Sequence, residues 1–115
     1  MAHIRHRWRD YATPSGNRPV RDFLRALSDA DRAAVLAAMA DVRREGLRSA
    51  RHLRGDIWEI RADGDRQTFR ILFAPEGRRS HVLLALEGFP KTTQRTPQEK
   101  IRLAERRLIN WRARG

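Results

Sequence analysis

Four charged side chains fall on or beside consecutive predicted strands, at positions suited to chemistry on a phosphate. Glu59 and Arg61 alternate with apolar residues in one segment. Arg70 does so in the next segment, and Lys91 follows the third. Because alternate residues of a strand share a face, Glu59, Arg61 and Arg70 are expected on one side of the sheet. A planar guanidinium binds a phosphate through two parallel hydrogen bonds, so this pattern favours an anion site. An ordinary cross-strand ion pair between Glu59 and Arg70 is the alternative.

The composition points to a polyanionic partner. The 115 residues include 23 Arg and 2 Lys against 14 Asp and Glu, which gives a formal net charge of +11. A large positive charge on a small protein is typical of nucleic-acid binding. There is no cysteine, and the four His residues lack zinc-ligand spacing, so we expect no disulfide, metal or other cofactor. No apolar run approaches the roughly 18 residues of a membrane span, which predicts a soluble cytoplasmic protein.

The hydrophobic pattern predicts a single α+β domain over residues 1–115. Period-two alternation indicates strands, and apolar residues at i, i+3, i+4 and i+7 indicate helices. The expected elements are an edge strand over 3–11, a loop over 13–18, helices beginning at 19 and 29, strands over 56–62, 67–74 and 81–86, and a helix from 97. This β-α-α-β-β-β-α order implies a twisted, mainly antiparallel sheet with the helices packed on one face. The other face, with Arg61 and Arg70, would then be open.

The C-terminal helix has the clearest pattern. Thr96 is expected as its N-cap, and Glu99 three residues later completes a capping box. An apolar stripe at helical spacing consists of Ile101, Ala104, Leu108 and Trp111. The other faces carry Arg102, Arg106, Arg107, Arg112 and Arg114. Since the last 25 residues hold +6 of the net charge, we expect this helix to present an exposed basic surface.

Three segments together resemble the HigB-like branch of the RelE/ParE toxin superfamily. They are Leu53–Arg61 (LRGDIWEIR), Phe69–Phe73 (FRILF) and Phe89–Pro97 (FPKTTQRTP). Residues 16–27 are also similar to the first helix of that branch, and the resemblance extends from residue 4 to residue 111. The three motifs in this order are specific, whereas any one of them alone is a weak signal. The element order predicted above is also the order that such toxins have.

This resemblance implies the toxin of a type II toxin–antitoxin pair that cleaves mRNA, usually in the ribosomal A site, without a metal. The RNA 2′-hydroxyl attacks the adjacent phosphate while side-chain cations stabilise the negative charge. By matching position, Arg61 and Arg70 are expected to contact the phosphate and its transition-state charge. Lys91 falls at the basic position after the last strand and is expected to stabilise the phosphate or the leaving group. Glu59, where RelE-type toxins have a lysine, is either the general base or a side chain that orients Arg61 or Arg70.

Further RNA contacts are expected beside these four residues. Arg51 and His52 lie close to the position at which one class of HigB-type enzymes has a catalytic histidine. Many members have two adjacent lysines after the phenylalanine of the third motif, where this sequence has Lys91 and Thr92. The predicted nucleic-acid-binding set is Arg51, His52, Arg54, Thr92, Thr93 and Arg95. The C-terminal tyrosine of RelE itself has no counterpart, which leaves the general acid and base open.

The implied partners are a helix-turn-helix antitoxin, the ribosome and mRNA, with no membrane and no metal. The basic C-terminal helix is expected to face the ribosome or the antitoxin. Two alternatives fit the same residues. One is a non-enzymatic ParE-type toxin that inhibits DNA gyrase, and the other is a basic RNA- or DNA-binding module without catalysis. Only the leading hypothesis predicts cut mRNA, so mapping of transcript ends separates it from both alternatives.

Overall fold

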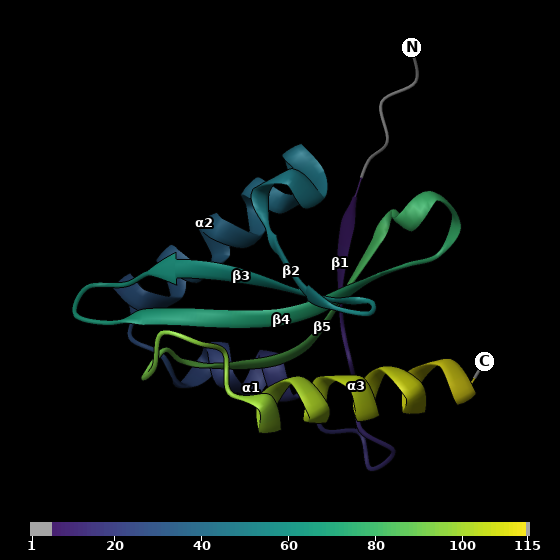
Figure 1. Ribbon diagram of the computed structural model, residues 1–115. Coiled ribbons are helices and arrows are strands. Elements are labelled where there is room, and N and C mark those ends of the chain that lie inside the picture. The colour runs from purple at the N-terminus through teal and green to yellow at the C-terminus, as the bar shows by residue number, and fades with distance from the viewer. Residues whose placement is uncertain (1–5, 115) are drawn as a thin grey trace.

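The computed structural model of the protein describes residues 6–114 and has one mixed sheet of five strands (Figure 1). The strands are β1 (Arg7–Asp10), β2 (Arg51–Arg54), β3 (Ile57–Asp63), β4 (Thr68–Glu76) and β5 (Val82–Pro90). They lie in the order β1-β5-β4-β3-β2. β1 runs parallel to β5, and the other three neighbouring pairs are antiparallel. The predicted α+β class and the mainly antiparallel sheet are therefore confirmed.

Helices α1 and α2 begin, and α2 ends, where local sequence signals place them. They are α1 (Pro19–Ala26), α2 (Asp29–Glu45) and α3 (Gln98–Ala113). Pro19 opens α1, since its missing N–H costs nothing in the first turn. At the start of α2, the Ser28 hydroxyl accepts a hydrogen bond from the Asp31 N–H at 3.2 Å. Gly46 ends α2 with a φ of 77°, a conformation that glycine adopts at little cost.

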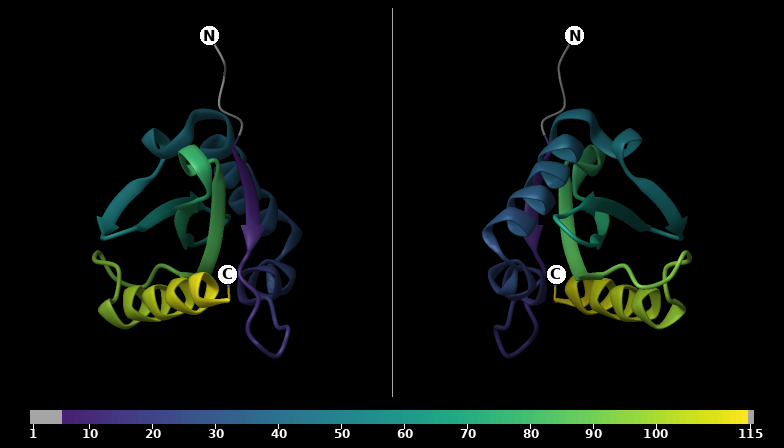
Figure 2. Two further views of the ribbon diagram at one scale, coloured as in Figure 1. Left: turned by 90° about the vertical axis from the view of Figure 1, so that its right-hand side faces the viewer. Right: turned by 90° about the vertical axis from the view of Figure 1, so that its left-hand side faces the viewer.

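The helices cover both faces of the sheet, so the expectation that they share one face is wrong. One core contains Val35 of α2 and Phe73 of β4, and a second core contains Leu108 of α3 and Leu72 of β4. Figure 2 shows α1 and α2 on one side of the sheet and α3 on the other. The physical reason is that β4 and β5 are continuously apolar for several residues. Strands of that kind need a covering layer on each face.

The edges of the sheet hold one confirmed strand and one that was not predicted. The described part of the predicted N-terminal strand forms the edge strand β1, while residues 3–5 lie outside the described residues. β2 forms the opposite edge, antiparallel to β3. This strand is short and charged, so its sequence has too few apolar residues for alternation to stand out. The element order is thus β-α-α-β-β-β-β-α, apart from two short 3₁₀ turns.

The start of α3 differs from the predicted capping box. The residue before the helix is Pro97, and no side chain caps the first turn. The Thr96 hydroxyl instead donates a hydrogen bond to Oε1 of Glu59 at 2.5 Å. Because α3 begins one residue later than predicted, Pro97 occupies the N-cap position and Thr96 precedes it. Thr96 therefore contacts the sheet and does not cap the helix.

The predicted exposed basic surface of α3 is only partly present. Arg107 donates to the Leu86 carbonyl at 2.7 Å, and Arg112 forms ion pairs with Glu76 at 2.7 Å and Asp56 at 3.0 Å. These contacts tie the helix to the strands and to the turn before β3. The arginines of α3 that are exposed without an ion pair to a described residue are Arg102 and Arg106. Within residues 6–114, no helix combines the length and hydrophobicity that crossing a bilayer requires.

Candidate nucleic-acid-binding site

The sheet face that α3 covers brings together three of the predicted site residues. Arg61 of β3 lies directly opposite Arg70 of β4, and Glu59 is diagonal to Arg70 across the same ladder. Oε1 of Glu59 and Nε of Arg70 form an ion pair at 3.2 Å, so the cross-strand pair expected from the sequence is present. The side chains of Arg70 and Glu59 are only 1% and 0% exposed, whereas Arg61 is exposed. Of these three groups, Arg61 alone is accessible to a ligand in this structure.

The expectation of an open face around Arg70 is therefore wrong. The chain that joins β5 to α3 passes over this part of the sheet, and Arg70 donates hydrogen bonds to its backbone. A side chain buried to this degree reaches no RNA phosphate unless the covering segment moves. The sequence pattern placed Arg70 on the correct face, but it contained no information on what covers that face.

Lys91 lies at the margin of the same face. Its backbone N–H donates to the Thr68 carbonyl at 2.7 Å, which extends the pairing of β4 and β5 by one residue. This bond fixes the Lys91 backbone next to the end of β4, and the side chain is half-buried. Arg61 and Lys91 thus flank the buried Arg70 from β3 and from the end of β5.

A polar groove of about 300 Å³ lies between β2 and the start of α3. It is lined by Arg51, Leu53, Arg54, Arg95, Thr96, Gln98 and Ile101. The groove brings together Arg51 and Arg54, which lie at the two ends of β2, and Arg95, which lies more than 40 residues later in the β5–α3 connection. Its volume is at the lower end of the range for ligand sites. Three guanidinium groups around one concavity favour a phosphate or another small anion.

The three arginines of the groove differ in how firmly they are held. Arg54 donates to both carboxylate oxygens of Glu105, at 3.2 and 2.7 Å, and to the Gln98 side chain at 2.6 Å. The hydrogen bonds with Glu105 raise the pKa of Arg54 above its usual value. Arg51 and Arg95 are exposed and have no ion pair with a described residue. Arg54 is therefore a fixed wall of the groove, while Arg51 and Arg95 are available to an anion.

The other predicted contact residues, His52, Thr92 and Thr93, do not line the groove. The His52 ring packs against Trp58 with centroids 4.9 Å apart, and its Nε2 lies 2.7 Å from the Gly55 carbonyl. Trp58 belongs to the α1–α2 side of the sheet, so His52 lies away from the groove. Thr92 and Thr93 are exposed in the connection that also carries Arg95.

Sequence reasoning missed two polar groove residues. Gln98 was not singled out, and Thr96 was assigned to helix capping. The available signal was the position of Thr96 in the same motif as Lys91 and Arg95, but the contact with Glu59 joins residues 37 positions apart. Such a contact follows from the tertiary fold and leaves no local pattern.

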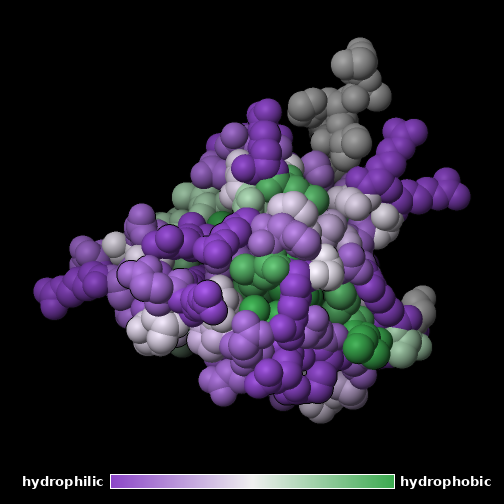
Figure 3. Space-filling view, in the orientation of Figure 1, coloured by the Kyte–Doolittle hydropathy of each residue, from purple (hydrophilic) through white to green (hydrophobic). Residues whose placement is uncertain are grey.

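The rest of the surface on this face is mainly hydrophilic, which suits a polar ligand (Figure 3). In the orientation of Figure 1, hydrophilic residues cover most of the face in view, with small hydrophobic areas between them (Figure 3). Among residues 6–114, no group of three or more His, Asp or Glu side chains is arranged to hold a metal ion. Arg51, Arg54 and Arg95 offer anion binding by guanidinium groups at the groove.

Comparison with known proteins places the chain in a family. No curated protein matches it. The family model described as "Phage derived protein Gp49-like (DUF891)" matches residues 22–109, which include all three motifs noted above. This family is one of RelE/HigB-like toxins. Because the match covers well over half of the sequence, the chain belongs to the Gp49-like family of phage-derived, toxin-like proteins.

Proposed function

We propose that this protein is the toxin of a type II toxin–antitoxin system, an endoribonuclease that cleaves mRNA on the ribosome and so inhibits translation. The observation that carries the proposal is the convergence of three exposed arginines and the half-buried Lys91 on one side of the molecule. Arg51 and Arg95 line the groove, and Arg61 and Lys91 flank the neighbouring part of the sheet. Membership of a RelE/HigB-like toxin family supports RNA over other polyanions.

The proposed reaction is an intramolecular transesterification. The 2′-hydroxyl oxygen attacks the adjacent phosphorus, and its proton passes to a base. The bond to the 5′-oxygen breaks, that oxygen takes a proton from an acid, and a 2′,3′-cyclic phosphate forms. Negative charge grows on the phosphoryl oxygens at the transition state, so nearby fixed cations accelerate the step. We assign this role to Arg61 and Lys91, because both are accessible and both flank the same sheet face.

We assign substrate binding to the groove. Arg51, Arg54 and Arg95 supply charge for the RNA backbone, with Thr92 and Thr93 as neighbouring hydrogen-bonding groups. Phosphate contacts of this kind position a nucleic acid without reading its sequence. A net charge of +11 also suits an acidic or nucleic-acid partner, and we propose a helix-turn-helix antitoxin as the neutralising protein.

The test is cleavage of a defined mRNA on purified translating ribosomes, mapped by primer extension. We expect Arg61→Gln and Lys91→Gln each to lower kcat/KM by about 100-fold or more, the cost of losing one transition-state donor. Arg25→Gln is the matched control, since Arg25 is an exposed arginine on α1, on the opposite side of the sheet. Full activity in both site variants would overturn the assignment of the site.

The cleavage assay, together with an assay of purified gyrase, also tests the two alternative functions. An inhibitor of DNA gyrase would leave the mRNA intact and would block supercoiling by purified gyrase. A binding module without catalysis would retain single-stranded RNA with a steep salt dependence but would cut nothing, even with ribosomes present. Either outcome would refute the proposed endoribonuclease.

A further inference from the structure

The segment between β5 and α3 is fastened to the sheet by a buried polar cluster. Nη2 of Arg70 donates to the carbonyl oxygens of Thr93 and Gln94, at 3.2 and 2.7 Å. The Thr96 hydroxyl donates to Glu59, which is itself paired with Arg70. The Glu59–Arg70 ion pair on the sheet therefore holds the segment at Thr93, Gln94 and Thr96.

The cluster holds the middle of this segment and not its ends. Lys91 is fixed independently, because its own N–H donates to Thr68 of β4. Pro97 is fixed by the start of α3. Between them, Arg95 makes no side-chain hydrogen bond or ion pair with a described residue, but both of its neighbours in the chain contact the cluster. The direction in which Arg95 projects into the groove is thus set through Gln94 and Thr96.

Burial of this cluster costs free energy, so a contribution to stability does not by itself explain why the cluster is present. A buried ion pair loses its hydration, and well-packed apolar residues are often as stable or more stable. In addition, the N-cap of α3 is Pro97, which has no side chain that can accept a hydrogen bond, and the Thr96 hydroxyl is directed to Glu59. Guanidinium suits this position because its planar fork can contact one carboxylate and two carbonyls at once. A lysine ammonium has no such fork.

From these contacts we propose that Arg70, Glu59 and Thr96 are positioning residues. They hold residues 93–96 so that Arg95 faces Arg51 across the groove, and Arg70 does not itself contact the phosphate. The part of this proposal that concerns RNA rests on the proposed function, whereas the part that concerns the segment does not. Arg95 contributes substrate binding and Lys91 contributes chemistry. Loosening the cluster is therefore expected to raise KM and to leave kcat close to its original value.

The first test compares Thr96→Val with Thr96→Ser in the full chain. Val has nearly the shape of Thr but cannot donate to Glu59, and Ser keeps the hydroxyl. We expect Thr96→Val to speed tryptic cleavage after Lys91 and Arg95 by about tenfold or more, because one charge-assisted bond that holds the segment is lost. We expect KM for ribosome-bound mRNA to rise about tenfold, with kcat within about threefold. Thr96→Ser should restore most of the resistance to cleavage and most of the affinity.

The second test separates positioning from direct phosphate contact at Arg70. Arg70→Lys keeps the positive charge but loses the planar fork that donates to Thr93 and Gln94. If Arg70 contacted the phosphate, this change would lower kcat. A positioning residue instead predicts faster tryptic cleavage after Lys91 and Arg95, a raised KM and a retained kcat. The proposal is overturned if Thr96→Val leaves the cleavage rate unchanged, if cleavage becomes faster while KM does not rise, or if Ser is as damaging as Val.

Failure of the proposed function is distinguishable from failure of this inference. If the original protein cuts no mRNA, the endoribonuclease proposal fails, and binding of a 12-nucleotide single-stranded RNA replaces KM as the readout. The tryptic digestion needs no ribonuclease activity. An unchanged cleavage rate and unchanged RNA binding in Thr96→Val would then refute the positioning cluster by themselves.

Discussion

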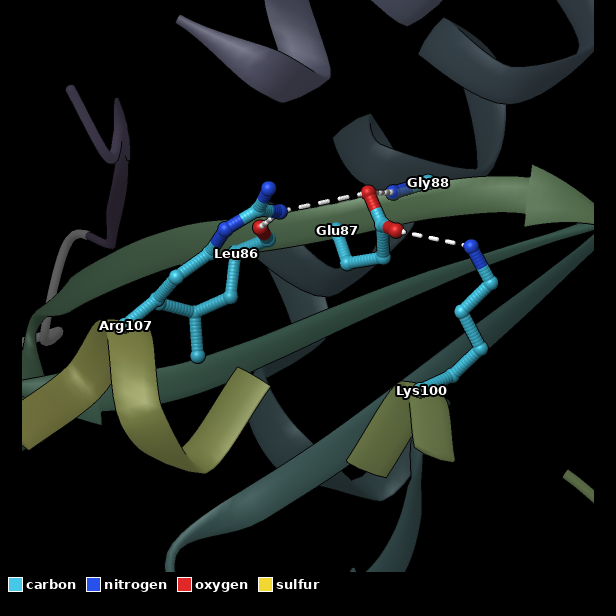
Figure 4. Close-up of polar contacts among 5 residues, drawn as sticks. All are labelled: Leu86, Glu87, Gly88, Lys100 and Arg107. Carbon is cyan, nitrogen blue, oxygen red and sulfur yellow. Dashed lines mark hydrogen bonds and ion pairs between the residues drawn. The ribbon is translucent and has the colours of Figure 1, made fainter. Parts of the chain in front are cut away.

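Glu87 joins the sheet to α3, and removal of its charge tests how strongly this contact holds the helix. Its side chain is 12% exposed on β5. Oε2 accepts a hydrogen bond from Lys100 Nζ at 2.9 Å, and Oε1 pairs with Arg107 Nη1 at 3.3 Å (Figure 4). Lys100 and Arg107 are seven residues apart and lie on the same side of α3. One carboxylate therefore binds two separate turns of the helix.

The expected loss of stability in Glu87→Gln follows from the burial of the two contacts that Glu87 makes with α3. Glu87→Gln keeps the shape and one acceptor oxygen but removes the charge between two cations. Hydrogen bonds to charged groups contribute about 1.5–3 kcal/mol each, and the amide retains part of this. We expect the free energy of unfolding to fall by about 2–3 kcal/mol, or roughly 10 °C in Tm for a chain of this size. Asp41→Asn is the control, because Asp41 pairs with Arg44 on the surface of α2, where both side chains are more than half exposed.

The assay is urea unfolding followed by circular dichroism, for the original protein and both variants. The surface pair should contribute about 0.5 kcal/mol or less. The two variants should therefore differ in midpoint while the slope of free energy against urea stays constant. If Glu87→Gln costs no more than Asp41→Asn, the contact does not hold α3 and the reasoning from burial is refuted.

Three further predictions use the same protein. Ser28→Ala removes the cap of α2 and should lower the free energy of unfolding by about 1 kcal/mol in thermal denaturation, and a cost near zero would contradict the capping bond. Gly88→Ala places a Cβ 2.6 Å from Phe23 Cδ2 and 2.9 Å from Ile71 Cδ1, so urea unfolding should show a loss of about 1–3 kcal/mol. A neutral result would mean that α1 can move away from β5. Arg95→Gln should reduce the slope of log affinity for single-stranded RNA against log salt by about 0.7, whereas an unchanged slope would show that Arg95 contacts no phosphate.

Local structure could be predicted from the sequence wherever a segment contains its own signal for a helix start, a cap or a helix end. Pro19 starts α1, Ser28 caps α2 and Gly46 ends it, because each acts on backbone groups within a few residues. Alternation in β3 and β4 placed Glu59, Arg61 and Arg70 on one face, since the side-chain period of a strand is two. The family was also evident from three short motifs, all of which lie in the region that the family model matches.

Only the tertiary structure decided which of these side chains are accessible. Alternation assigns a residue to a face but carries no information about the layer that covers it, so Arg70 was expected on the surface and is buried beneath the β5–α3 connection. The hydrogen-bond partner of a polar side chain can likewise lie far away in the sequence. Thr96 has the spacing of a helix cap, but α3 begins one residue later, and the Thr96 hydroxyl donates to Glu59, which is 37 positions away in the sequence. The sequence determined the elements and the charges, and the packing of α3 determined which charges can meet a ligand.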